Sequence, residues 1–183
     1  ALVNPNRADC AYPFKGLAAV GVAFKVVQAL SAELIAESER RRYLNSLLDL
    51  VALGTVADVA PMVGENRLLT RRGMEVLADT NRPGLLALKT ISGTADRPVD
   101  TTAIGFFLGP RINSAGRLAT ADLALRLLRS RDTAEAEELA EALNELNMER
   151  QTLQNSGMDE AVRLVEDEGL DRHKILVLRG DEW

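Results

Sequence analysis

Residues 47–61 read LLDLVALGTVADVAP and form the most apolar continuous run in the chain. This run predicts a core helix that ends by Pro61, because proline cannot continue a helix. Asp58 lies near its end, where a carboxylate is costly to bury without a partner. Two interpretations are open from these residues: Asp58 faces solvent or bonds nearby backbone N–H groups, or it is a metal ligand or general base. Asp49 cannot assist, since nine helical residues at about 100° each place the two carboxylates on opposite faces.

The composition describes a water-soluble globular chain. Of 183 residues, 46% are hydrophobic, 27% charged and only 4% aromatic, which is enough apolar material for one domain or two small ones. The single cysteine, Cys10, excludes an internal disulfide, and no run of about 20 apolar residues predicts a membrane span. No signal peptide is recognisable, so we expect a cytoplasmic protein. Because the chain starts at Ala1 without methionine, we also expect it to be a piece of a longer protein.

Charge is distributed unevenly along the chain, whose formal net charge is −5. Residues 1–59 are neutral overall, residues 60–131 carry a net +5, and residues 132–183 carry a net −10. The acidic average argues weakly against nonspecific nucleic-acid binding, whereas the basic middle permits a local anion site. A solvated acidic helix face explains the last third equally well.

Apolar periodicity predicts a predominantly helical chain with a strand at each end. The strands are expected at residues 1–6 and at Lys174–Arg179. The basic triplet Arg40-Arg41-Arg42 is interpreted as a solvated corner before the helix that carries Asp58. Helices are expected over 16–34, in the run that stops by residue 61, from 65 to 77, at 85–91, at 101–108, from about 120, and over 133–170.

The last of these helices is unusually long. About 36 residues would span about 54 Å. A coiled coil is one interpretation, but Arg150 and Gly157 interrupt the leucine seam. A helix that joins two domains therefore fits the pattern better.

A distinctive segment at residues 109–117 reads GPRINSAGR and is interpreted as a loop. Its two arginines, amide and hydroxyl suit a phosphate, because arginine binds phosphate with paired hydrogen bonds. Gly116 would let backbone N–H groups approach a ligand closely. The segment matches neither a Walker loop nor a dinucleotide-binding loop. A structural turn with surface arginines explains the same residues about as well.

Other catalytic constellations are missing from the sequence. The only histidine, His173, is interpreted as a surface residue, and no Cys/His cluster or obvious second acid accompanies Asp58. Lys25, the one charge inside the 16–34 helix, is either a snorkelling side chain or an anion ligand. By its own residues, the chain is not expected to hold a catalytic metal alone.

Several blocks of sequence follow one another in a specific order: YPFK at 12–15, GVAFK at 21–25, LDLVALGTVADVAP at 48–61, ENR at 65–67, GPRINSAGR at 109–117, and LN at 143–144 followed by Asn147 and ERQ at 149–151. Together they closely resemble the RecJ single-strand-specific DNA exonucleases of the DHH phosphoesterase superfamily. The resemblance covers essentially the whole chain but only a middle section of the family's length. One departure is Ala19, where the family often has glycine.

The resemblance implies an α/β fold for the full protein and a division of this chain into three parts. Residues 1–118 would form the C-terminal part of a DHH catalytic domain, and residues 119–170 would be connector helices. Residues 171–183 would begin a DHHA1-type domain with its first strand.

The resemblance also implies an activity and its residues. The activity is hydrolysis of single-stranded DNA in the 5′→3′ direction during repair and recombination, with two manganese or magnesium ions. Asp58 matches the last acidic metal ligand, and Arg117 is the first choice for the scissile phosphate, so both are expected to be catalytic. Arg111, Asn113 and Ser114 are expected to help bind the substrate.

The implied partners are single-stranded DNA, a helicase and a single-strand-binding protein, with no membrane, and the protein is expected to be a monomer. The chain alone is expected to be inactive, because the other metal ligands are implied to lie outside it. The sequence leaves open the role of Lys25 and of a polar stripe on the long helix, formed by Asn144, Asn147, Gln151 and Gln154.

Two alternatives remain. One is a related DHH phosphodiesterase that acts on short oligonucleotides or cyclic dinucleotides; the 109–117 segment and the long helix favour RecJ over it. The other is a noncatalytic helical scaffold that binds replication partners. Aspartate and His-His motifs ahead of residue 1 in the coding sequence would favour the nuclease over the scaffold.

Overall fold

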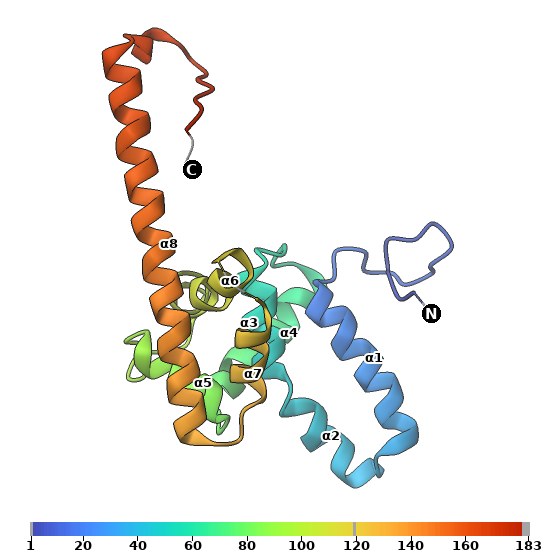
Figure 1. The fold of residues 1–183 in the computed structure, drawn as a ribbon. Coiled ribbons are helices and arrows are strands. Elements are labelled where there is room, and N and C mark those ends of the chain that lie inside the picture. Colours follow the sequence, from blue (N-terminus) through green and yellow to red (C-terminus); the bar gives the residue numbers. More distant parts are fainter. Residues whose placement is uncertain (1, 119, 181–183) are drawn as a thin grey trace.

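The computed structural model describes residues 2–118 and 120–180, apart from the side chains of Arg117, Leu118 and Asp171. It is a helical body from which the second half of one long helix projects (Figure 1). The elements in chain order are α1 (Ala19–Leu34), α2 (Glu37–Asn45), α3 (Leu48–Ala57), α4 (Gly64–Ala78), α5 (Pro83–Ile91), the π-helical η1 (Ala103–Leu108), α6 (Gly109–Leu118), α7 (Asp122–Arg129), α8 (Thr133–Asp167) and the 3-10 turn η2 (Leu170–Arg172).

Most of the predicted helices are confirmed, with ends that differ by a few residues. The long helix is α8, which runs without a break through Gly157 to Asp167. Its N-cap is Asp132, whose side chain accepts a hydrogen bond from the backbone N–H of Glu135 and so satisfies an exposed donor of the first turn. Among the described residues, no helix is both long and apolar enough to cross a membrane.

The basic triplet lies inside a helix, α2, and is not the corner that the sequence predicted. Arg40 reaches back to the end of α1, where its guanidinium donates to the backbone oxygens of Ser31, Ala32 and Ile35 at 3.1 to 3.3 Å. The last carbonyls of a helix have no partner within the helix, and a cation there also opposes the helix dipole favourably. One arginine of the triplet is therefore part of the α1–α2 connection.

Neither predicted strand is present among the described residues. Residues 2–18 form turns and irregular structure, and residues 173–180 form a bend and irregular structure. Ile175 and Val177 are 85% and 93% exposed. A strand needs a neighbour for its backbone hydrogen bonds, and the described chain offers none to either segment.

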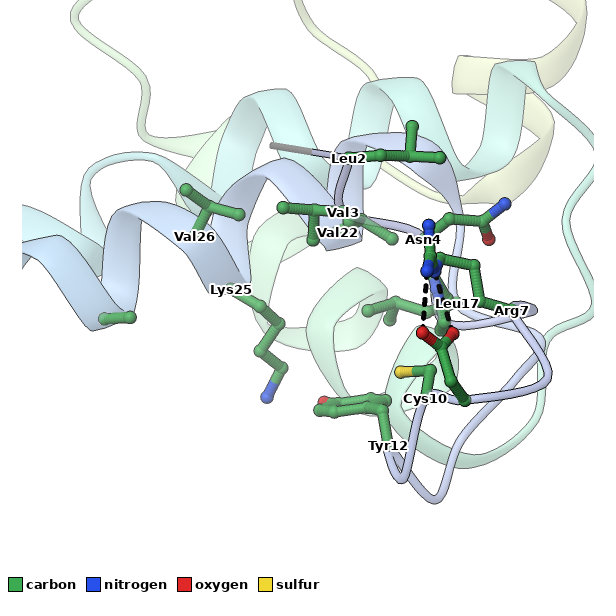
Figure 2. A pocket seen from close by; sticks show the side chains of 13 residues that line it. Leu2, Val3, Asn4, Arg7, Cys10, Tyr12, Leu17, Val22, Lys25 and Val26 are labelled. Atoms are coloured by element: carbon green, nitrogen blue, oxygen red, sulfur yellow. Dashed lines mark hydrogen bonds and ion pairs between the residues drawn. The ribbon is translucent and has the colours of Figure 1, made fainter.

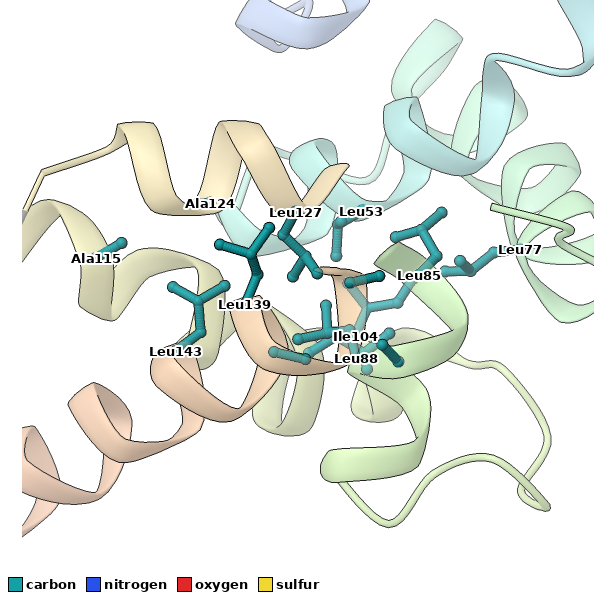
Figure 3. Packing of buried hydrophobic residues seen from close by; sticks show 14 of the residues in the cluster. Leu53, Leu77, Leu85, Leu88, Ile104, Ala115, Ala124, Leu127, Leu139 and Leu143 are labelled. Atoms are coloured by element: carbon teal, nitrogen blue, oxygen red, sulfur yellow. The ribbon is translucent and has the colours of Figure 1, made fainter. Parts of the chain in front are cut away.

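The core is a cluster of leucine, isoleucine and alanine side chains at the meeting point of α3, α5, η1, α7 and the first half of α8 (Figure 3). Leu85, Leu88, Ile104, Leu127 and Leu143 are fully buried. The leucine seam of α8 is covered only in this first half, since Leu153 is 42% exposed further along the helix. A second, smaller cluster around Phe24, Leu48 and Val51 joins α1 to α3.

Helices α3 and α4 approach each other very closely at Gly73. A Cβ added there would lie 2.1 Å from the backbone oxygen of Leu48 and 2.7 Å from the Cβ of Ala52. Since both neighbours belong to buried positions of α3, neither has room to move. Glycine is therefore required for α4 to lie against α3, and this pair makes the most extensive helix contact of the described chain.

We predict that Gly73→Ala destabilises the chain by about 3 kcal/mol or more, because the added methyl must push the two helices apart. Gly116→Ala is the matched control, since a Cβ there meets nothing within 4 Å and alanine gains about 1 kcal/mol over glycine in a helix. Urea unfolding followed by circular dichroism measures both variants. Equal stability of the two variants would contradict the close contact.

Candidate active site

Asp58 is the C-terminal cap of α3 and is exposed to solvent. Its backbone N–H donates to the oxygen of Gly54, but its carboxylate has no hydrogen bond or ion pair among the described residues. The C-terminal end of a helix carries partial negative charge, so a carboxylate there is unfavourable for stability. A bound cation would remove both this repulsion and the lack of a partner.

The residue after Asp58 is held in a strained conformation. Val59 has φ 53° and a side chain that is 87% exposed. The N–H groups of Val59 and Ala60 donate to the oxygens of Val56 and Thr55, which is the Schellman pattern that normally places glycine at this position. A β-branched residue with positive φ is a rare outlier, and such outliers concentrate at functional sites.

Helix α6 begins directly beside Asp58. A Cβ added to Gly109 would lie 3.2 Å from the Cβ of Ala57, the last residue of α3. Residues four apart share one face of a helix, so Asn113 follows Gly109 on the face next to the end of α3. Asn113 is exposed on this face. The structure therefore brings Asp58 and the start of the 109–117 segment together.

Residues 109–117 are helical, which corrects the prediction of a loop. The chain is helical from Thr101 through the π-helical η1 into α6, with Gly109 itself in the right-handed region. In a helix, most backbone N–H groups bond the preceding turn, so those near Gly116 are not open to a ligand as the loop interpretation assumed. Gly109 is tolerated because it fits against α3, and Pro110, which lacks a donor N–H, directly follows the π-helical η1.

Two of the predicted phosphate-binding residues are committed to the contact between α6 and α8. Arg111 donates from Nη1 to the oxygen of Phe107 at 2.7 Å and from Nε to Oδ1 of Asn144 at 2.9 Å. Burial lowers the pKa of Arg111. Ser114 is fully buried and its hydroxyl donates to the oxygen of Arg111 at 2.7 Å, with the oxygen of Leu143 a second neighbour. Ser114 thus lies in the packing of α6 on α8, where no ligand reaches it in this conformation.

Arg117 belongs to the last turn of α6, and its side chain lies outside the described residues. Position 117 follows Asn113 by four residues, one helical turn further along α6. Three members of the polar stripe of α8 accept hydrogen bonds from arginines. Asn144 accepts from Arg111, and Arg150 donates from Nη2 to the buried Asn147 and from Nη1 to Gln154.

Asn66 holds the loop that carries Asp58, and sequence reasoning did not single it out. This buried side chain donates to the oxygens of Pro61 and Gly16 at 3.0 and 2.7 Å and accepts from the N–H of Ala18 at 3.1 Å. It thereby ties the α3–α4 loop to the start of α1. Asn66 belongs to the ENR block at 65–67, but an amide in the first turn of a predicted helix is too common to reveal this role.

Lys25, whose role the sequence left open, forms an ion pair with Glu65 of α4 at 2.5 Å. Tyr12 donates to the other oxygen of the same carboxylate at 2.5 Å. These hydrogen bonds, from Lys25 first and then Tyr12, lower the pKa of Glu65, and the hydrogen bond to Glu65 raises the pKa of Tyr12. Burial alone would lower the pKa of Lys25, but Glu65 raises it overall.

Lys25 and Tyr12 also border a hollow of about 620 Å³ between α1 and the N-terminal segment (Figure 2). Its lining does not include Asp58 or any residue of α6. Arg7 and Asp9 pair with each other at its edge. The hollow is therefore next to the residues that brace the Asp58 loop but is separate from the candidate site.

Asp49 has a structural role at the other end of α3. It is buried, accepts from Nε of Arg82 at 2.9 Å and from the hydroxyl of Thr80 at 3.1 Å, and has no access to Asp58. Among the described residues, no group of three or more His, Cys, Asp or Glu side chains is placed to hold a metal ion. Asp58, an exposed carboxylate without a partner, fits the contribution of one ligand to a divalent cation.

The sequence matches known proteins over almost its whole length. It is 46% identical over 179 residues to the single-stranded-DNA-specific exonuclease RecJ of Bacillus subtilis, covering 98% of this chain and 22% of that protein. It is 41% identical over 173 residues to RecJ of Escherichia coli K12, covering 91% of this chain and 30% of that protein. No family model matches the chain. The chain thus spans less than a third of the length of these relatives.

The fold matches as well. The crystal structure of RecJ from Thermus thermophilus in complex with Mg²⁺ has a TM-score of 0.72 and 35% identity, covering 82% of this chain and 23% of that one. The Mn²⁺ complex from the same organism has a TM-score of 0.71 at 35% identity, covering 84% and 22%. The two curated relatives are named as single-stranded-DNA-specific exonucleases. The family is RecJ, and the chain corresponds to one segment of it.

We predict that Glu65→Gln weakens the loss of stability in acid. Because the folded-state pKa of Glu65 is lowered, its ionised form stabilises the fold above its ordinary pKa, and this contribution is lost as the pH falls through the lowered value. Unfolding midpoints in urea at about pH 6 and below about pH 4 should therefore differ less in the variant than in the parent chain. Glu33→Gln, at an exposed residue without a partner among the described ones, should keep the parent's pH dependence.

We predict that Val59→Gly raises the free energy of unfolding by about 1 kcal/mol, because glycine adopts positive φ without a steric penalty. Val59→Ala is the control: it removes the same exposed methyl groups but keeps a Cβ, so it should gain much less. Denaturant titration of both variants gives the comparison. An alanine variant as stable as the glycine variant would show that strain is not the cause.

Proposed function

We propose that the protein is a 5′→3′ exonuclease that hydrolyses single-stranded DNA in repair and recombination with two divalent metal ions, Mn²⁺ or Mg²⁺. The observation that carries this proposal is Asp58: an exposed, unpartnered carboxylate at the negative end of a buried helix, followed by a strained residue. The names of the relatives, and the Mg²⁺ and Mn²⁺ in related structures, agree with it. The site is completed by residues outside this chain.

In this proposal Asp58 is a metal ligand on a rigid support. Helix α3 is buried along its length, and Asn66 fixes the loop that follows, so the carboxylate is held without an ordering cost at the moment of reaction. Bound metal ions in such sites activate water and stabilise the charge of the phosphate that is attacked. The chain's own contribution is to orient one carboxylate toward them.

Helix α6 provides the substrate side of the site. Arg117 is assigned to the scissile phosphate, and the exposed Asn113 to a neighbouring phosphate oxygen on the same face. Arg111 and Ser114 hold α6 against α8. The guanidinium of Arg111 donates to Asn144 of α8, and Ser114 is packed between the two helices. Arg111 keeps donors beyond the two it uses here, so a secondary phosphate contact remains part of the proposal.

The remaining parts of the proposal concern the whole protein. Residues 1–118 belong to a DHH catalytic domain with an α/β fold, α7 and α8 form the connector, and residues 171–183 enter a DHHA1-type domain. The protein acts as a cytoplasmic monomer on single-stranded DNA, with a helicase and a single-strand-binding protein as partners. The projecting second half of α8 agrees with a connector, because its apolar seam is only partly covered here.

The test is mutation of Asp58 and Arg117 in the full-length protein. Asp58→Asn and Arg117→Ala should each lower Mn²⁺-dependent degradation of single strands by about a hundredfold or more. Asp79→Asn is the matched control, since Asp79 is also an exposed aspartate at a helix C-cap, on α4, and should keep the parent rate. Strands blocked at the 5′ or the 3′ end report the direction.

Three outcomes would contradict the proposal in different ways. A normal rate for Asp58→Asn removes this residue from the metal site. Faster hydrolysis of short oligonucleotides or cyclic dinucleotides than of long single strands would favour the related phosphodiesterase. No hydrolysis by the parent protein with either metal would favour the noncatalytic scaffold.

A further inference from the structure

A hollow of about 460 Å³ lies between α2 and α4, at the opposite end of α3 from Asp58. It is lined by Ser38, Arg41, Arg42, Asn45 and Arg72. Three of these five side chains are guanidinium groups and none is a carboxylate, in a chain whose net charge is −5. This concentration of positive charge in one hollow needs a physical explanation.

Packing within the chain explains only part of it. Arg40, the first residue of the basic triplet, is used to cap α1 and does not line the hollow. Arg72 donates from Nε to Asn45 at 3.2 Å and pairs through Nη1 with Glu75, which fixes its orientation. The position of Arg42 in the last turn of α2 is favoured by the helix dipole, an effect of well under 1 kcal/mol at an exposed site. No such effect explains Arg41, and the guanidinium groups of Arg41 and Arg42 make no hydrogen bond or ion pair with the described residues.

Two further arginines of α4, Arg67 and Arg71, add positive charge on a neighbouring face of the helix, about 100° or more around its axis from Arg72. Arg67 and Arg71 are exposed, lie four residues apart on one face of the helix, and have no partner among the described residues. No acidic residue occurs between positions 66 and 74. Helix α4 runs antiparallel to α3, since Gly73 packs on Leu48 at the start of α3 while Asn66 contacts the loop after Asp58. Arg67 is therefore at the Asp58 end of α4, and Arg72 is at the end that borders the hollow.

We propose that the α2–α4 hollow binds backbone phosphates of a nucleic-acid strand away from the reacting centre, and that Arg67 and Arg71 continue this contact toward Asp58. This inference rests on the proposed function. Guanidinium groups bind phosphate oxygens in pairs, and basic grooves of this kind track a single strand without reading its sequence. The ten residues of α3 separate the two ends by about 15 Å at 1.5 Å per residue, so one strand can contact both.

The lining distinguishes a nucleic-acid backbone from an acidic peptide. No aromatic or aliphatic side chain borders the hollow, so it offers neither a surface for a base to stack on nor a pocket for an apolar peptide side chain. What it offers is charge and two neutral hydrogen-bonding groups, Ser38 and Asn45. A repeating phosphate backbone requires no more than this, and the contact should be independent of base sequence.

The test is the salt dependence of single-strand binding by the full-length protein, measured with a labelled oligonucleotide in the presence of a chelator that prevents cleavage. Each phosphate contact with a single strand contributes about 0.7 to the slope of log K against log salt concentration, so the Arg41→Gln/Arg42→Gln double variant should lower the slope by about 1.4. It should also weaken binding at low salt. The control variant Arg129→Gln/Arg131→Gln removes the same charge from two exposed arginines near the end of α7 and should keep the parent slope.

Further measurements keep the inference open to refutation. Arg41→Lys/Arg42→Lys should keep most of the slope, since lysine retains the charge, and thermal unfolding should show that all variants fold. A slope for the glutamine variant equal to that of the control would overturn the inference. Loss of binding to a polyglutamate peptide with unchanged DNA binding would overturn it in favour of a protein partner. If the inference is overturned but the parent protein keeps a normal Mn²⁺-dependent nuclease rate, the proposed function still stands. A parent protein that binds no single-stranded DNA would contradict both the inference and the proposed function.

Discussion

The contact between α3 and α4 at Gly73 is the constraint on which the rest of the molecule depends. Only glycine permits the backbone of α4 to pass so close to Leu48 and Ala52. With α4 in place on one side, α1 and the η1–α6 helix cover other sides of α3. A helix enclosed in this way has little freedom to shift, so the position of its exposed end is determined by the core. That end is where Asp58 lies.

The two aspartates of α3 differ in burial and in their partners. Asp49 is buried and therefore needs donors, which Arg82 and Thr80 supply. Asp58 is exposed at the negative end of the same helix, where nothing in the described chain compensates it. The strained Val59 beside it adds a second cost to stability. Strain and uncompensated charge at one place are typical of functional positions, which is the physical basis for the candidate site at this end.

Helix α6 has a supported side and an exposed side. Its inner side, with Arg111 and Ser114, is joined to α8 by hydrogen bonds, and its other face follows the end of α3 through Gly109 and Asn113. The long helix α8 therefore takes part in positioning the candidate site through Asn144, while its second half extends away from the body. Any displacement of α8 would be transmitted to α6 by these contacts.

The sequence by itself determined most of the helices, the length of α8 and the family, and it singled out Asp58 as a candidate metal ligand. Apolar periodicity and the order of motifs along the chain are properties of the sequence alone. The sequence did not predict those conformations and side-chain roles that depend on contacts with distant parts of the chain. Residues 109–117 contain turn-forming residues, yet they are helical because α3 and α8 provide a fitting surface. Arg40, Lys25 and Asn66 have roles set by atoms up to 50 positions away in sequence. Such pairings arise only when the helices pack, so tertiary structure alone decided which polar residues hold the fold and which are left to bind a ligand.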